Sequence, residues 1–194
     1  MEKYDLILSD PPWEQRKGGT RKCRPFQGVK LDYPTLPLSE IMAIHAGFMK
    51  YAADDHLFFL WTIDKFLHDS EYMMAELGYR LHARLIWNKA NGVAPCFSVR
   101  FSHEYLLFLY RGKFRSVASS ERGKIMTVFE ERPTGHSRKP EISYGIIERL
   151  YPNARKLELF ARRERAGWDA WGNEVENVVS FEPEKTEHYG LVQY

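Results

Sequence analysis

Short apolar runs alternate with segments of helical periodicity along this chain, and this alternation constrains the fold more than any other feature. The apolar runs have the length of buried strands and cover Tyr4–Ser9, His56–Ile63, Tyr79–Lys89, Glu104–Lys113, Lys124–Glu130 and Arg155–Arg162. Apolar residues at helical spacing predict helices over Ser39–Ala53, Phe66–Gly78 and Pro140–Leu150. Such alternation is typical of an α/β domain with a mainly parallel sheet, in which the third and fourth runs are candidates for an antiparallel pair.

The length of 194 residues fits one domain, which we place at residues 1–174, with 175–194 as a C-terminal tail. A formal net charge of +2 does not by itself indicate a nucleic-acid binder, so any such role must come from local charge. Cys23 and Cys96 fit neither a disulfide framework nor a metal site, which favours a reducing, cytoplasmic setting. We expect no signal peptide and no membrane span, because the apolar runs are short and interrupted.

The first apolar run ends in a stiff polar corner, "DPPW", at Asp10–Trp13. Ligands of parallel α/β sheets bind at the carboxyl ends of the strands, so chemistry is expected at this corner. Asp10 is a hydrogen-bond acceptor, while Pro11 and Pro12 fix the backbone and leave their carbonyls free to accept. Trp13 adds a flat stacking face. A planar ligand with an amino group that donates two hydrogens fits such a slot, and adenine and cytosine both qualify.

Two further stretches have the residue types that contact nucleic acids. A glycine-containing segment after the corner is expected to close over the substrate backbone through its cations Arg16, Lys17, Arg21, Lys22 and Arg24. The stretch Val93–His103 is basic and aromatic, and its Phe97 and Arg100 are candidates to stack on or clamp nucleotides beside the target. For both stretches, a loop without a partner is the alternative.

Seven stretches, in this order and spacing, resemble the family of adenine N(6)-methyltransferases whose best-known member methylates adenosine in messenger RNA. They are Asp10–Trp13, Tyr33–Ile41, Leu57–Ile63, Leu85–Lys89, Ser102–Lys113, His136–Pro152 and Arg155–Glu174. The resemblance implies a Rossmann-like fold that binds S-adenosylmethionine, with the catalytic strand before the cofactor strand in sequence, a permuted order. A glycine-rich cofactor loop is missing, and Ala161 stands at the equivalent place.

The resemblance also implies which residues bind the cofactor. The family has ligand roles at the positions that match Asp10, Lys139, Glu158, Arg162, Asn173 and Glu174. Taken alone, Lys139 and Arg162 would be read as solvated surface cations. Glu158 is more informative, because a carboxylate inside an apolar strand needs a partner.

The chemistry of the target amine suggests a mechanism. The exocyclic nitrogen of adenine is a poor nucleophile because its lone pair is delocalised into the ring. Acceptance of its two hydrogens by Asp10 and the Pro11 carbonyl would make that lone pair available. The methyl donor is already activated and its leaving group is neutral, so position and orientation are the main contributions of the protein and no metal is expected.

Three hypotheses stay open: an adenine methyltransferase acting on DNA, which we favour, the same enzyme acting on RNA, and a catalytically silent subunit that binds nucleic acid. The intact corner and the intact "WGNE" at Trp171–Glu174 favour catalysis. In a duplex the target amine lies inside the base stack. The small size of the chain therefore predicts that a lone protomer prefers unpaired adenine, and that efficient work on duplex requires a second protomer or a partner subunit.

Overall fold

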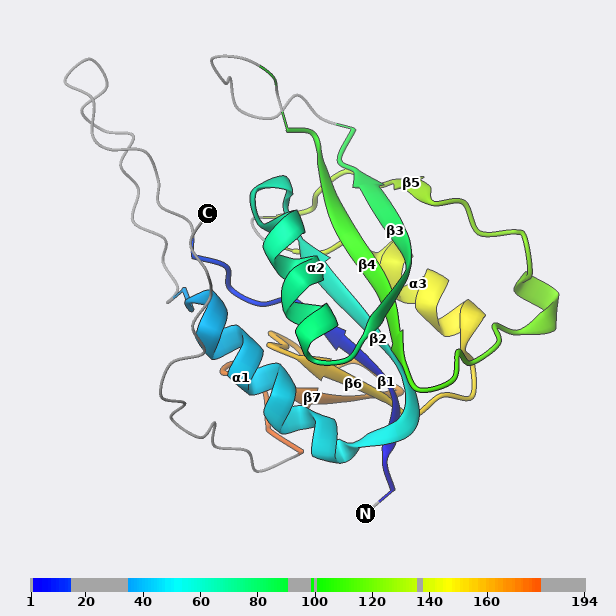
Figure 1. Ribbon diagram of the computed structural model, residues 1–194. Helices are drawn as coiled ribbons and strands as arrows, with labels where there is room; N and C mark the ends of the chain where they lie inside the picture. The colour runs from blue at the N-terminus through cyan, green and yellow to red at the C-terminus, as the bar shows by residue number, and fades with distance from the viewer. Residues whose placement is uncertain (1, 15–34, 91–98, 100, 136–137, 179–194) are drawn as a thin grey trace.

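A seven-stranded mixed sheet is the centre of the computed structural model, which describes residues 2–14, 35–90, 99, 101–135 and 138–178 (Figure 1). The spatial order of the strands is β5-β3-β4-β2-β1-β6-β7. Their bounds are Tyr4–Ser9 (β1), Ala52–Thr62 (β2), Arg80–Asn88 (β3), His103–Arg111 (β4), Val128–Glu130 (β5), Lys156–Leu159 (β6) and Trp168–Trp171 (β7).

The prediction of a mainly parallel sheet is confirmed. Strands β1, β2, β6 and β7 pair in parallel, as do β3 and β5. Strand β4 is antiparallel to both β2 and β3, so the expected antiparallel pair is also present. Because β4 runs the opposite way, its first residues lie at the edge where the parallel strands end.

Helices cover both faces of the sheet, with α1 (Leu38–Phe48) and α2 (Leu67–Glu76) on one and α3 (Glu141–Leu150) on the other (Figure 1). The strand residues alternate between the two cores, as the pleat requires. In β1, Ile7 packs in the cluster that includes α1 and α2, whereas Leu6 and Leu8 pack in the cluster that includes α3. Strands buried on both faces explain why the apolar runs of the sequence are nearly continuous.

Several predicted boundaries are wrong, some of them for clear local reasons. The first helix begins at Leu38, one residue before the predicted start at Ser39, and Pro37 precedes it. That helix ends at Phe48, and after the 3₁₀ turn Met49–Tyr51 strand β2 begins at Ala52, within the stretch predicted to be helical. Strand β6 ends at Leu159 because Phe160 has a φ of +60°, a left-handed conformation that breaks the ladder.

Candidate active site

The corner after β1 lies at the carboxyl edge of the sheet, as predicted, but its carbonyls are not free. The Trp13 N–H donates to the Pro11 carbonyl at 2.9 Å, and the Leu36 N–H donates to the Pro12 carbonyl at 2.9 Å. The expectation of two free acceptors is therefore corrected. Each carbonyl oxygen still has a second lone pair, so Pro11 retains the capacity to accept one more hydrogen.

Trp13 is a core residue, and this corrects the expectation of an open stacking face. Its side chain is only 6% exposed and its ring stacks on Phe66, with centroids 5.4 Å apart and an angle of 19°. Its indole N–H donates to the Trp61 carbonyl at 3.1 Å. Trp13 therefore anchors the backbone of the corner to the core, and its replacement would destabilise the fold as well as the site.

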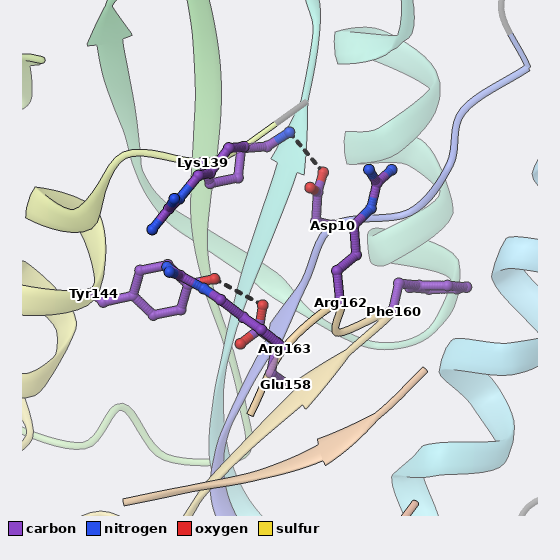
Figure 2. A pocket seen from close by; sticks show the side chains of 8 residues that line it. Asp10, Lys139, Tyr144, Glu158, Phe160, Arg162 and Arg163 are labelled. Atoms are coloured by element: carbon purple, nitrogen blue, oxygen red, sulfur yellow. Dashed lines mark hydrogen bonds and ion pairs between the residues drawn. The ribbon is translucent and has the colours of Figure 1, made fainter. Parts of the chain in front are cut away.

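Asp10 is one end of a chain of four alternating charges. Its Oδ1 pairs with the Lys139 Nζ at 2.8 Å, as Figure 2 shows. The same ammonium lies 3.2 Å from Oε2 of Glu104, whose other oxygen pairs with the Lys89 Nζ at 2.5 Å. Two of these residues, Glu104 and Lys89, were not anticipated. The charges of these four side chains sum to zero, so each buried ion is offset by a neighbour.

Burial and ion pairing have opposite effects on the pKa values of these charged side chains. Burial raises the pKa of Asp10, and the nearby Lys139 ammonium opposes that shift without cancelling it. For Lys139, burial is outweighed by Asp10 and Glu104 together, which hold the pKa of its ammonium above the ordinary value. For Glu104, burial is likewise outweighed, here by the two lysines, and its pKa is lowered.

Glu158 faces the same space from the neighbouring strand. Leu8 of β1 pairs in register with Glu158 of β6, and alternation places Asp10 on the same face, toward α3. The phenol of Tyr144, a residue of α3, donates to the Glu158 Oε1 at 2.7 Å (Figure 2). Burial raises the pKa of Glu158 to about 7, while the Tyr144 hydrogen bond opposes the rise. The partner that a carboxylate in an apolar strand needs is thus a hydroxyl.

Arginine side chains hold Tyr144 in place. The Arg165 guanidinium lies 3.9 Å from the centroid of the Tyr144 ring, and that of Arg163 lies 5.9 Å away. Both arginines also pair with Glu141 in the first turn of α3. The ring is therefore fixed between its own helix and the segment after β6.

A cavity of about 220 Å³ lies between these groups. Its lining residues, which Figure 2 draws as sticks, are Asp10, Arg138, Lys139, Tyr144, Glu158, Phe160, Arg162 and Arg163. Four of the six residues predicted to bind a cofactor therefore line one cavity. Both signs of charge are present, which suits a ligand that itself has an ammonium, a carboxylate and hydroxyl groups.

The other two predicted cofactor residues do not line this cavity. Asn173 and Glu174 are exposed in the turn after β7. That turn approaches the segment after β6 closely: a Cβ on Gly172 would lie 2.1 Å from the carbonyl oxygen of Ala161, between the cavity-lining residues Phe160 and Arg162. Only glycine fits there, which explains why the turn can lie so near the cavity wall.

The residues predicted to contact the substrate lie outside the described part of the chain: Arg16, Lys17, Arg21, Lys22, Arg24, Phe97 and Arg100. Their flanks are described. Trp13 and Leu36 form a bridge at the base of the first stretch, and the Lys89 N–H donates to the Ser102 carbonyl at 2.9 Å at the base of the second. Both stretches therefore begin and end at the edge that holds Asp10.

Within the described residues, no group of three or more His, Cys, Asp and Glu side chains is arranged to hold a metal ion. Over the same residues, no helix has the length and apolar character that crossing a bilayer requires.

A buried histidine lies next to the end of β1, where His45 Nε2 is 2.9 Å from Ser9 Oγ. Burial lowers the pKa of His45 to about 3, so it is a neutral core group at physiological pH.

Comparisons with known proteins show the family to which the chain belongs. The MT-A70 family model matches residues 4–174. The type II methyltransferase M.MunI of a Mycoplasma species is 27% identical over 189 residues, 90% of this chain and 78% of that protein. The N(6)-adenosine-methyltransferase MT-A70-like protein of Drosophila melanogaster is 28% identical over 95% of this chain, and the human catalytic subunit METTL3 is 26% identical over 95%. The chain spans only 29% and 30% of the lengths of these two relatives.

Proposed function

Because this chain belongs to the MT-A70 family of adenine N(6)-methyltransferases, we propose that it transfers a methyl group from S-adenosylmethionine to the exocyclic amine of adenine in DNA. The observation that carries this proposal is the meeting of Asp10, Lys139 and Glu158 around one cavity at the ends of β1 and β6. Acceptors and a cation converge there without a metal-like cluster among the described residues.

The donor set fits the cofactor. The Lys139 ammonium suits its carboxylate, Asp10 suits its ammonium, and Glu158 with Arg162 suits its ribose hydroxyls. The cavity of about 220 Å³ is smaller than sites that enclose a drug-sized ligand, so further walls are required. We assign these to Asn173 and Glu174 in the turn beside the cavity. In this assignment β6 is the cofactor strand, and it follows the catalytic strand β1 along the chain.

Asp10 and the Pro11 carbonyl act on the target amine. When bound, S-adenosylmethionine supplies a methyl group that its sulfonium already activates. Asp10 accepts one hydrogen of the amine and the second lone pair of the Pro11 carbonyl accepts the other. The nitrogen lone pair is then less delocalised into the ring and can attack the methyl group. After transfer the nitrogen loses one proton, for which Asp10 is the nearest acceptor. Positioning accounts for most of the acceleration.

We favour DNA over RNA because the chain spans 78% of a type II methyltransferase but less than a third of the eukaryotic relatives. The stretches at 16–24 and 93–103 are proposed to grip the substrate backbone and the nucleotides beside the target. RNA is the second candidate substrate, since the family includes adenosine methyltransferases.

The test is a methylation assay with labelled cofactor and one sequence offered as single-stranded, mismatched and fully paired DNA, and as RNA. We expect the highest kcat/KM on unpaired adenine in DNA, because flipping a paired base costs a few kcal/mol. We also expect activity on duplex to rise with protein concentration if a second protomer assists. Absence of transfer to every substrate would refute the proposed function, and preference for RNA would transfer it to the second candidate.

A separate variant tests the basic stretch. Neutralising Arg21, Lys22 and Arg24 together should weaken binding to all sequences and reduce the salt dependence by up to about three units of slope, one for each phosphate that is no longer neutralised. An unchanged slope would assign the stretch to a loop without a nucleic-acid partner.

A further inference from the structure

The Lys139 ammonium lies between two carboxylates, 2.8 Å from Asp10 and 3.2 Å from Glu104. We propose that Glu104 and Lys89 are positioning residues that set how firmly Lys139 holds Asp10, and so how readily Asp10 is released to accept the target amine. This inference rests on the proposed function, because it takes Asp10 as the group that meets the substrate.

Glu104 lies in β4, and Lys89 directly follows the end of the adjacent strand β3. Glu104 is the second residue of β4 and pairs in register with Trp87 of β3, two residues before Lys89. The Lys89 backbone N–H is held by the Ser102 carbonyl at 2.9 Å. Their ion pair of 2.5 Å therefore joins β4 to the backbone just after β3, where pairing with the neighbouring segment is already set, and Glu104 has little freedom to follow Lys139.

Two tryptophans lie beneath the lysines. The Lys89 ammonium is 5.2 Å from the centroid of Trp87, and that of Lys139 is 5.5 Å from the centroid of Trp61. The two rings are 6.0 Å apart at an angle of 75°. A cation over an aromatic face is stabilised there, so both ammonium groups have a preferred site beside Glu104 as well as a carboxylate partner.

In this row of four charged side chains, each inner group is shared by two groups of opposite charge. Asp10 and Glu104 compete for Lys139, while Lys139 and Lys89 compete for Glu104. Side-chain exposures of 13–24% mean that water screens these interactions only in part. Removal of the charge of Glu104 should therefore leave Lys139 entirely to Asp10. Removal of Lys89 should draw Lys139 toward Glu104 and away from Asp10.

Release of Asp10 matters because its Oδ1 is occupied by Lys139 in this structure. The target amine requires a carboxylate oxygen as acceptor, and Lys139 is also the cation proposed for the cofactor carboxylate. A lysine shared with Glu104 can give up Asp10 without losing all of its negative partners. Glu104 thus lowers the cost of exchanging one partner for another.

The two variants Glu104→Gln and Lys89→Met give opposite predictions. The other groups that face Asp10 are Arg162, Glu158 and Tyr144, and neither variant alters them. Glu104→Gln removes a negative neighbour and tightens the grip of Lys139, so Asp10 should ionise at lower pH. Lys89→Met loosens that grip, so Asp10 should ionise at higher pH.

The experiment has two readouts. In the protein without cofactor, the ¹³C carboxyl signal of Asp10 is titrated, with Asp10→Asn identifying it. In the methylation assay, the acid limb of kcat/KM is measured against pH. We expect both to move down in pH for Glu104→Gln and up for Lys89→Met, with roughly a tenfold loss of kcat/KM at neutral pH for Glu104→Gln.

Glu71→Gln is the matched control, because it removes another carboxylate paired with a cation, Arg84, on the surface between α2 and β3. It should leave both readouts unchanged. Shifts of Asp10 in the same direction for both variants, or no shift in folded protein, would overturn the inference. A purely structural role would lower the melting temperature without moving the acid limb. If the parent protein methylates no substrate but the pKa of Asp10 shifts as predicted in both variants, the proposed function is refuted. The inference that Glu104 and Lys89 act on Asp10 through Lys139 then still holds.

Discussion

Asp10 directly follows β1 and Glu158 lies inside the adjacent strand β6; both face one cavity, yet their partners differ in kind. Asp10 is paired with an ammonium, that of Lys139, whereas Glu158 accepts a hydrogen bond from the phenol of Tyr144. An ammonium favours the ionised carboxylate strongly, and a neutral hydroxyl does so only weakly. Burial raises the pKa of both carboxyls. The Lys139 ammonium opposes the rise at Asp10, while Glu158, whose pKa is about 7, can change its charge near neutral pH.

The largest expected effect comes from Asp10. Asp10→Ala should abolish methyl transfer, a loss of at least about 1,000-fold, because the amine loses its charged acceptor. The fold should persist, since Lys139 keeps Glu104 as a partner. Activity and thermal melting of the variant are compared with those of Asp64→Ala, an exposed acid on the turn after β2. If folded Asp10→Ala turns over as fast as the parent, Asp10 has no part in methyl transfer, and the proposed difference in task between Asp10 and Glu158 is wrong.

The second effect concerns Glu158. Glu158→Ala should weaken S-adenosylmethionine binding about 10- to 100-fold in calorimetry at pH 8, because a buried acceptor of hydroxyl groups is lost. Asn173→Ala should also weaken binding, but less, since Asn173 is exposed and outside the cavity lining. If both variants bind like the parent, the cofactor assignment to these positions fails.

The third effect is on pH dependence. A carboxyl group whose pKa is raised on folding binds its proton more tightly in the folded state. The contribution of Glu158 to stability is therefore complete below its unfolded value of 4.5 and is lost as pH rises through about 7. The loss of stability between these pH values should be about 2 to 3 kcal/mol larger in the parent than in Glu158→Gln. Denaturant unfolding at pH 5 and pH 8 checks this, and identical pH dependence would contradict it.

The smallest effect tests the partner instead of the carboxylate. Tyr144→Phe removes the hydroxyl that stabilises ionised Glu158, so the pKa of Glu158 should rise further. Cofactor binding at pH 7 should weaken only a few-fold and recover at higher pH. Calorimetry at the two pH values measures this, and a loss that persists at high pH would mean that Tyr144 contacts the cofactor directly.

Sequence reasoning found the carboxylates more readily than their partners. Asp10 is visible because it ends an apolar run, and Glu158 because it interrupts one. Glu104 also stands at the start of an apolar run, but its place beside Lys139 depends on β4 running antiparallel with one particular register. Tyr144 reads as an ordinary helix residue, and only the packing of α3 directs its hydroxyl to Glu158.

The remaining differences have similar causes. Strand β7 was not predicted because it has only four residues, and its buried positions Trp168 and Ala170 make too short an alternation to detect. Trp13 was expected to face a ligand, since sequence cannot show that Phe66 already covers its ring. Composition and spacing identify elements and edges, while the direction of a side chain depends on neighbours distant in the chain.

The central place of β1 has a consequence for the order in which the protein is made. One of its neighbours, β2, is the next strand along the chain, but the other, β6, is synthesised only after β3, β4 and β5. Asp5 accepts a hydrogen bond from the backbone of Arg155, 150 positions later. A growing chain on the ribosome therefore holds β1 with one side unpaired until Leu159 has emerged. Asp10 meets Glu158 only then, so no incomplete translation product lacking β6 has the assembled cavity.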